Sequence, residues 1–223
     1  SGDTRNDSGW FTGTVTLTPD SGYRISKDGT TWSDTLTVID DGESTVTYYL
    51  KDRNGSITDQ KTVTIKKDST APGGEIKAGE NSFTKFLNTI TFGYFFKNTV
   101  DVEISGTDAT SGIAKIEYQK VAKGETYNAD GTWTAGTSFS MTANDKSVIY
   151  ARITDVAGNT VILNSEGIVV YTDATTSDSV EYTRTTKTDV TSAIELKGNT
   201  VEEMKNGDAL LREGTDYTVT FSN

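Results

Sequence analysis

The sequence predicts an all-β protein built from small antiparallel sandwiches, and three observations support this fold class. Apolar residues come in short runs dominated by Val, Ile, Thr and Tyr, which are residue types that β-strands favour. Gly, Asp and Asn separate the runs at intervals of about ten residues, as in sandwiches whose short strands are joined by tight turns. Only 33% of the 223 residues are hydrophobic, so several small cores are expected rather than one large core.

The first predicted sandwich covers residues 1–68. A turn at Asp28-Gly29-Thr30-Thr31-Trp32 interrupts its predicted strands, which lie in "TGTVTLTP", "YRIS", "DTLTVI", "STVTYYLKD" and "KTVTIKKD". The stretch "KKDSTAPGGE" follows and holds Pro72, which cannot donate a ladder hydrogen bond and biases Ala71 toward extended geometry. We therefore predict a domain boundary near Ser69.

The second predicted sandwich covers residues 69–173 and follows the order of the first, with insertions. Each copy has a Tyr-containing strand, an Asp-Gly-Thr turn that ends in Trp32 or Trp133, a second Tyr-rich strand and a final Val/Ile strand. Such a divergent tandem repeat is typical of domain arrays. The remaining residues, 174–223, number about fifty, fewer than a free-standing sandwich normally needs, so a partial domain is expected there.

The strongest apolar cluster lies near the start of the second copy, in "FTKFLNTITFGYFF". Phe83, Phe86 and Ile90 have the spacing of a helical face, whereas Ile90, Phe92 and Tyr94 alternate as in a strand. We expect a short helix or turn that leads into a strand.

Composition excludes several classes of function. A formal charge of −11 argues against nucleic-acid binding, which needs clustered Lys and Arg. No apolar run approaches the roughly 20 residues of a spanning helix, so no membrane insertion is expected. The chain has no His and no Cys, so it lacks the usual zinc and haem ligands and the nucleophile pairs of many hydrolases. We therefore expect no catalytic residues and no enzymatic activity.

The stretch "ARITDVAGNTVIL" is centred on residues that suit a tight hairpin turn. Gly158 can adopt positive φ, and the side chains of Asp155 and Asn159 can bind turn amides. The alternative is a calcium site, to which Asp108 would add an oxygen if its loop lay at the same pole. Calcium takes six to eight oxygens, so the turn is the preferred interpretation and no cofactor is expected. The first copy has "DRNGS" over residues 52–56, which keeps the glycine but ends in Ser.

Trp32 and Trp133 follow equivalent turns in the two copies, and Trp10 stands alone near the start. An aromatic residue that recurs at one place in a repeated fold is more often a packing residue, because a large indole usually buries most of its area. The alternative is a ligand site in which these flat rings stack on sugars.

Several of these motifs together resemble bacterial immunoglobulin-like repeats, which occur in large surface-attached or secreted proteins of Gram-positive bacteria. The resemblance covers roughly Trp10 to Thr172. It rests on Asp68-Ser69-Thr70-Ala71-Pro72, Asp108 with Ser111-Gly112-Ile113, Ile116-Glu117-Tyr118, Tyr150-Ala151-Arg152 and Asp155-Val156-Ala157-Gly158-Asn159.

The tail is similar to the X-type immunoglobulin-like modules found beside catalytic and cellulose-binding domains in cellulosomal and other carbohydrate-active proteins. This similarity implies a module that is incomplete over residues 174–223. It rests on Asp189, Leu196, Gly198-Asn199-Thr200, Asn206-Gly207, Leu211 and Gly214-Thr215-Asp216-Tyr217.

The two resemblances imply tandem immunoglobulin-like sandwiches that act as a non-catalytic spacer in a modular, carbohydrate-associated bacterial protein. Such a protein is expected outside the cell or at the cell wall, with the neighbouring domains of its own polypeptide as partners. The alternative is an adhesin or glycan-binding module whose candidate ligand residues are Trp10, Trp32 and Trp133. Its partner would be a host or dietary glycan or a surface protein.

Overall fold

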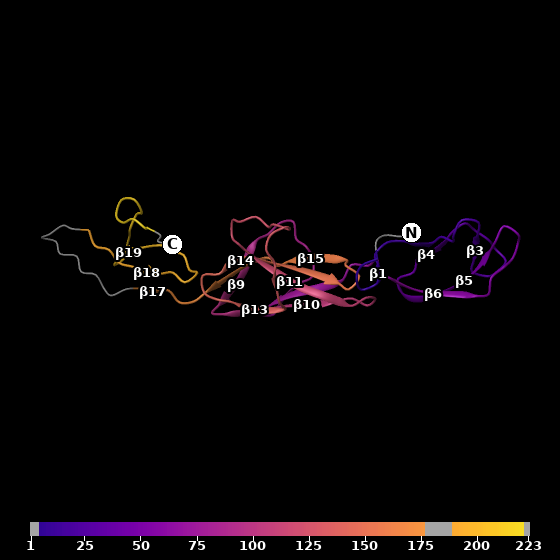
Figure 1. Cartoon of the computed structure of the whole chain (residues 1–223). Coiled ribbons are helices and arrows are strands. Elements are labelled where there is room, and N and C mark those ends of the chain that lie inside the picture. Colours follow the sequence, from indigo (N-terminus) through magenta and orange to yellow (C-terminus); the bar gives the residue numbers. More distant parts are fainter. Residues whose placement is uncertain (1–4, 177–188, 221–223) are drawn as a thin grey trace.

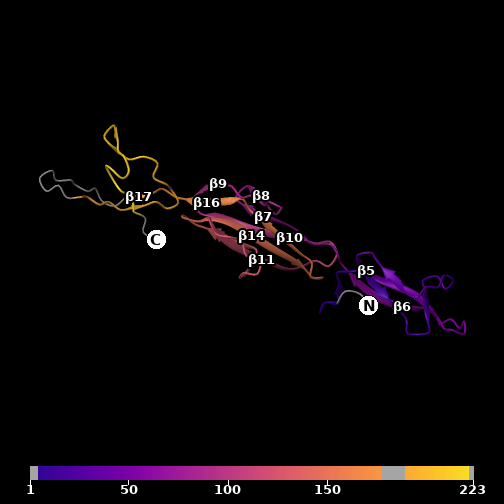
Figure 2. The same cartoon turned by 90° about the horizontal axis from the view of Figure 1, so that it is seen from above.

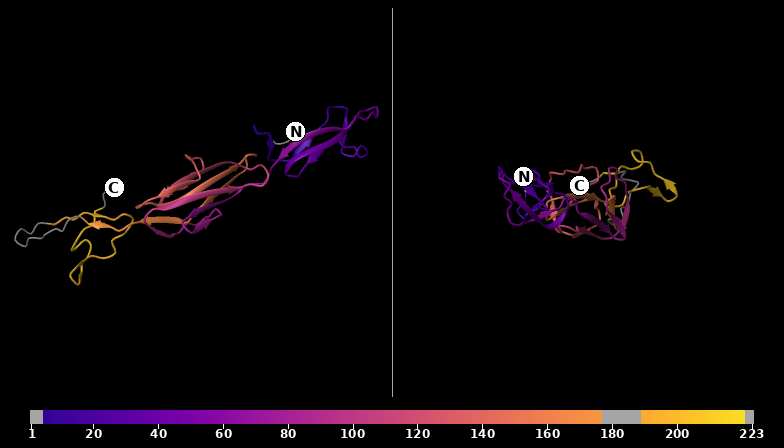
Figure 3. Two further views of the ribbon diagram at one scale, coloured as in Figure 1. Left: turned by 90° about the horizontal axis from the view of Figure 1, so that it is seen from below. Right: turned by 90° about the vertical axis from the view of Figure 1, so that its right-hand side faces the viewer.

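The computed structural model describes residues 5–176 and 189–220, and the protein is all-β, as the sequence predicts. Strands β1 to β20 follow one another without a helix in the described residues. Accordingly, no helix there is long and apolar enough to cross a membrane. Three units follow one another along one long axis: the first holds β1 to β6, the central β7 to β16 and the third β17 to β20 (Figures 1 and 3).

The first unit consists of two small sheets. One sheet has the strand order β1-β6-β5-β3, and the other pairs β2 with β4. Buried Val15 and Val38 from the smaller sheet meet Val46 and Ile65 from the larger one, and they form the core. The strands are β1 (Trp10–Phe11), β2 (Val15–Leu17), β3 (Arg24–Ser26), β4 (Leu36–Val38), β5 (Gly42–Lys51) and β6 (Lys61–Lys67).

The central unit is larger and also has two main sheets. Their strand orders are β8-β7-β10-β13 and β12-β11-β14-β16-β9. Strand β15 belongs to the second sheet as well, where it pairs with β14. The strands of this unit run along the long axis of the molecule (Figure 2). They are β7 (Gly73–Ala78), β8 (Asn81–Phe83), β9 (Phe92–Lys97), β10 (Val100–Thr107), β11 (Ile113–Ala122), β12 (Thr134–Ala135), β13 (Ser138–Met141), β14 (Lys146–Asp155), β15 (Thr160–Asn164) and β16 (Gly167–Tyr171).

The core of the central unit lies between its two sheets. Along β10, buried Val100, Val102 and Ile104 alternate with exposed residues, as a strand with one buried face requires. They belong to the same buried cluster as Ile149 and Ile153 of β14 in the opposite sheet.

The first and central units have the same order of four paired strands. In each unit an early strand pairs in parallel with the last strand, β1 with β6 and β9 with β16. The last strand then pairs antiparallel with β5 or β14, which in turn pairs antiparallel with β3 or β11. The two units therefore place equivalent loops at equivalent ends.

The stretch between β8 and β9 contains bends and no helix, so only the turn-and-strand form of the prediction holds there. Phe83 packs in the main core, whereas Ile90 packs with Tyr150 on the other face of β14. Fully buried Asn164 also binds both backbone groups of Leu87, accepting from its N–H and donating to its carbonyl oxygen. The residues of the expected helical face thus serve two different cores.

The third unit contains only short ladders. Its described residues are mostly exposed and form no buried hydrophobic cluster of their own. The pairs are β17 (Thr175–Thr176) with β18 (Ile194–Glu195) and β19 (Lys205–Asn206) with β20 (Ala209–Leu210).

Candidate functional site

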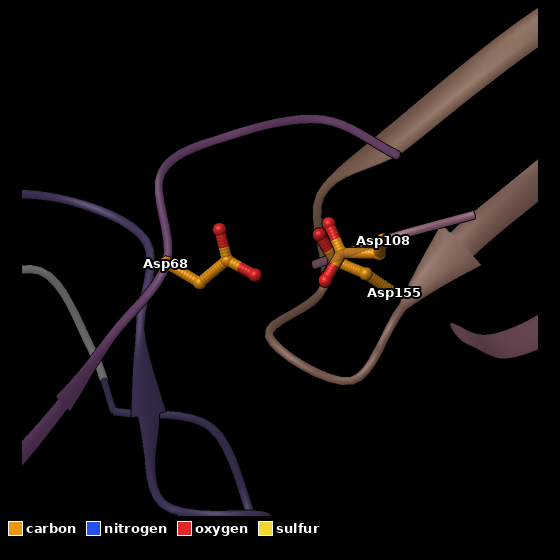
Figure 4. A group of neighbouring side chains, drawn as sticks. All are labelled: Asp68, Asp108 and Asp155. Carbon is orange, nitrogen blue, oxygen red and sulfur yellow. The ribbon is translucent and has the colours of Figure 1, made fainter. Parts of the chain in front are cut away.

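The candidate site lies at the junction between the first and central units, where three carboxylates face one another (Figure 4). Asp68 directly follows β6, Asp108 directly follows β10, and Asp155 ends β14. One carboxylate oxygen from each residue lies within 4.8 Å of the other two. Asp68 and Asp155 are 0% and 1% exposed, so two of the three side chains are removed from water.

Asp155 closes the hairpin between β14 and β15. Its Oδ1 accepts hydrogen bonds from the backbone N–H groups of Gly158 (2.6 Å) and Asn159 (2.8 Å). Gly158 has a φ of +103°, a conformation that strains residues with a Cβ. The segment therefore folds as a tight turn in which the aspartate side chain supplies the acceptor for the N–H of Asn159 and a second acceptor for that of Gly158, which also donates to the backbone oxygen of Asp155 (3.2 Å).

Asp108 organises the neighbouring loop between β10 and β11 in the same manner. Its Oδ1 accepts hydrogen bonds from three successive backbone N–H groups, those of residues 110–112, at 3.1, 2.8 and 2.7 Å. The two loops are tied together because the N–H of Val156 donates to the carbonyl oxygen of Gly112 (2.9 Å). Asp108 and Asp155 consequently lie at the same pole of the central unit.

Asp68 and Asn6 connect the first unit to these loops. The carboxylate of Asp68 accepts hydrogen bonds from the N–H groups of Thr70 and Ser111, both at 3.1 Å. The backbone oxygen of Asp68 accepts another from Nδ2 of Asn159 (2.9 Å). Nδ2 of Asn6 donates to two carbonyl groups of the β14–β15 hairpin, at 2.7 and 2.9 Å. The junction is thus a hydrogen-bonded interface between the two units.

Negative charge is concentrated at this interface. Within the described ranges, no Lys or Arg forms an ion pair with Asp68, Asp108 or Asp155. Carboxylate oxygens in this arrangement are the donors that a hard divalent cation such as Ca²⁺ uses, and they supply part of the six to eight oxygens it takes. Asn159 directs its Nδ2 to Asp68 and Asp155, so this nitrogen serves as a hydrogen-bond donor.

The first unit has the same turn at its far end. Oδ1 of Asp52 accepts hydrogen bonds from the N–H groups of Asn54 and Ser56, both at 2.8 Å. Gly55 has a φ of +90° and corresponds to Gly158. The two turns differ in their last residue, which is Ser56 in the first unit and Asn159 in the central unit.

An ion pair between a buried lysine and a more exposed aspartate lies immediately before the junction. Lys67 is 5% exposed and places Nζ 2.5 Å from Oδ1 of Asp41. The hydroxyl groups of Ser69 and Thr70 also donate to Asp41, at 2.9 and 3.0 Å. Burial alone would raise the pKa of Asp41, but the hydrogen bonds from these three residues outweigh it and lower the pKa to about 2. The start of the linker is therefore anchored to the first unit.

The structure does not bring the three tryptophans together, and no ring contact joins them in the described residues. All three are half-buried. A cation covers one face of each ring: Lys66 lies 5.9 Å from the centroid of Trp10, Lys51 4.7 Å from that of Trp32 and Arg152 4.4 Å from that of Trp133.

Trp32 and Trp133 occupy comparable places in their units. Each follows an Asp-Gly-Thr turn and lies under a cation from β5 or β14, which hold the same position in the shared strand order. Trp133 also makes an edge contact with Tyr127 and donates from Nε1 to the carbonyl oxygen of Ala129 (3.0 Å). Trp133 thus packs in a cluster of its own unit, and Trp32 contacts Lys51 of its own unit.

Sequence reasoning did not single out Asp68 or Asn6 for this site. Asp68 and Asp173 each end a copy in the sequence, but Asp68 directly follows β6 whereas Asp173 lies two residues after β16, so the repeated aspartate was only a partial signal. Asn6 lies in no motif, so no pattern in the sequence pointed to its contact with the central unit.

No model of a known protein family matches the chain, and no curated protein matches it. Function therefore has to be inferred from the fold and from the junction.

Proposed function

We propose that the chain is a non-catalytic structural spacer, in which tandem immunoglobulin-like sandwiches hold other modules of a bacterial protein at a set separation. The observation that carries this proposal is the hydrogen-bonded junction. Units joined by a linker without such contacts move independently as a rule. Here Asp68 and Asn6 both bind loops of the central unit, which restricts that motion.

The shared strand path supports the immunoglobulin-like part of the proposal. Both units pair an early strand in parallel with the last strand and continue through two antiparallel neighbours. The motif resemblance places such units in surface-attached or secreted proteins of Gram-positive bacteria, in carbohydrate-associated arrays. Under this proposal the protein works outside the cell or at the cell wall, and its partners are adjoining domains of the same polypeptide.

Glycan binding through Trp10, Trp32 or Trp133 has weaker support as a function. Sugar stacking needs an accessible aromatic face, and each of these half-buried rings already has a cation over one face. The rings also lie on separate parts of the molecule instead of forming one platform.

Distance measurements between spin labels on the two units test the spacer proposal. The chain has no Cys, so Thr62→Cys and Ser138→Cys place one label on an exposed strand position of each unit without competing sites. Pulsed electron–electron double resonance should give one narrow distance distribution. A broad distribution, as expected of two units on a flexible tether, would refute the proposal.

A further inference from the structure

Two asparagine side chains at successive junctions each donate one hydrogen bond to the preceding unit and one within their own turn. At the first junction, Nδ2 of Asn159 donates to the backbone oxygen of Asp68 (2.9 Å), the residue directly after β6. The same nitrogen also donates to Oδ2 of Asp155 in its own turn (2.8 Å). One N–H of the carboxamide thus holds the turn, and the other holds the chain that leaves the preceding unit.

At the second junction, Asn199 makes the corresponding bond to the preceding unit, and its partner within the turn is a backbone oxygen instead of a carboxylate. Its Nδ2 donates to the backbone oxygen of Thr172 (2.5 Å), the residue directly after β16, and to that of Leu196 in its own turn (2.7 Å). The N–H of Thr172 donates in return to the carbonyl oxygen of Lys197 (3.0 Å). In both places the carbonyl that is bound belongs to the first residue after the last strand of the preceding unit.

The two asparagines share a local sequence as well as a contact. They stand in "AGNT" and "KGNT", and the preceding glycines, Gly158 and Gly198, have φ values of +103° and +89°. A Cβ on Gly198 would lie 2.5 Å from the backbone oxygen of Val170, closer than real Cβ atoms approach. At this position glycine permits the close approach of the turn to β16.

We propose that the Gly-Asn turn is the positioning device of the array: Asn159 and Asn199 each fix the orientation of their own unit on the end of the unit before it. This inference rests on the proposed spacer function and names the residues that set its geometry. It also assigns a surface to the third unit, whose turn at residues 196–199 docks on the end of β16.

The first unit supplies a natural control for this role. Its equivalent turn ends in Ser56, at the end of the unit away from the central unit, and within the described residues no hydrogen bond joins the Ser56 side chain to another unit. A serine has a single hydroxyl hydrogen, whereas a carboxamide has two N–H donors. Asn159→Ser therefore leaves a residue that this type of turn already accommodates, and it removes one of the two hydrogen bonds that Nδ2 donates. The turn of Asn199 is different, with Lys197 as well as Gly198 at positive φ, so Ser56 is the natural control for Asn159 alone.

The test compares Asn159→Ser and Asn199→Ser with Ser56→Ala. One label pair, Thr62→Cys with Ser138→Cys, reports the first junction, and a second pair, Ser138→Cys with Asp208→Cys, reports the second. Loss of one such hydrogen bond should raise the population of the opened junction about fivefold. Asn159→Ser should broaden only the first distribution, Asn199→Ser only the second, and Ser56→Ala neither.

Thermal unfolding of each variant, followed by near-ultraviolet circular dichroism, separates a loosened junction from a damaged unit. The proposal predicts that the distances change while the unfolding of the central unit does not. Narrow distributions in both Asn→Ser variants would overturn the positioning role while leaving the spacer function intact. A broad first distribution in the unsubstituted protein would instead overturn the spacer function itself.

Discussion

Lys67 and Asp41 form an ion pair at the end of the first unit, with Nζ and Oδ1 2.5 Å apart, immediately before the residue that enters the junction. This pair makes the stability of the first unit depend on pH in the acidic range. The hydrogen bonds that reach Asp41 outweigh its burial and lower its pKa from 3.8 to about 2 in the folded state. A carboxyl group with a lowered pKa contributes its stability above the unfolded pKa and loses it as the pH falls through the folded value.

The stability of the first unit should therefore decline as the pH falls from about 4 to about 2. Urea unfolding across this range, compared with that of Asp41→Asn, measures the effect. The variant should be less stable near neutral pH, and its stability should depend less on pH. Parallel pH profiles for the two proteins would show that the ion pair does not cause the acid sensitivity.

Asp155→Ala should lower the free energy of unfolding of the central unit by about 2 kcal/mol, because the N–H of Asn159 loses its acceptor and that of Gly158 keeps only its longer bond to the backbone oxygen of residue 155. Asp155→Asn keeps an oxygen at Oδ1 and should cost less. Chemical denaturation of both variants gives the comparison, and Asp52→Ala serves as a control that should affect only the first unit. Equal losses for Ala and Asn would assign the effect to the charge instead of the acceptor.

Calcium tests the alternative interpretation of the three aspartates: if they hold a divalent cation, calcium should raise the unfolding temperature of the protein. A divalent cation among Asp68, Asp108 and Asp155 would offset the repulsion between three charges that lie within 4.8 Å of one another. Calorimetry in the presence of calcium and of a chelator measures the shift. Asp68→Asn should reduce the shift, whereas Asp41→Asn at the same end of the unit should not. If calcium does not change the unfolding temperature, these carboxylates serve only to form their turns.

Trp133→Ala should destabilise the central unit by about 2 kcal/mol, since the half-buried ring packs against Tyr127 and under Arg152. Denaturant unfolding measures the loss, and Trp133→Phe should recover part of it. A glycan array probed with the unsubstituted protein should show no binding that Trp133→Ala removes. A signal that disappears in the variant would favour the glycan-binding alternative.

Local patterns were sufficient to predict the all-β class and the hairpin turn. Val100, Val102 and Ile104 alternate with polar residues, and this alternation directly encodes a strand with one buried face. Gly158 and Asp155 likewise carry the requirements of their turn within five residues of sequence. Where propensity, spacing and turn chemistry all favour the same local structure, contacts with distant residues rarely change it.

The junction could not be predicted in this way, because its contacts join residues far apart in sequence. Asn6 and the hairpin carbonyl groups that it binds are separated by 150 and 151 positions, and their meeting depends on how one unit sits on the next. The stretch after Phe83 shows the same limit. Its spacing fits a helix, but the hydrogen bonds between Leu87 and Asn164, 77 positions away, hold a non-helical path.

The parallel pairing of β9 with β16 has a mechanical consequence. These strands run along the axis on which the units are arrayed (Figure 2), and β16 is the strand that leads to the next unit. Tension along the polypeptide therefore acts in shear on the ladder that joins β9 (Phe92–Lys97) to β16 (Gly167–Tyr171). In shear, the hydrogen bonds of this ladder have to break together instead of one after another. Pulling a single molecule from its two ends should show the central unit yielding at a higher force than the third unit, whose ladders are two residues long.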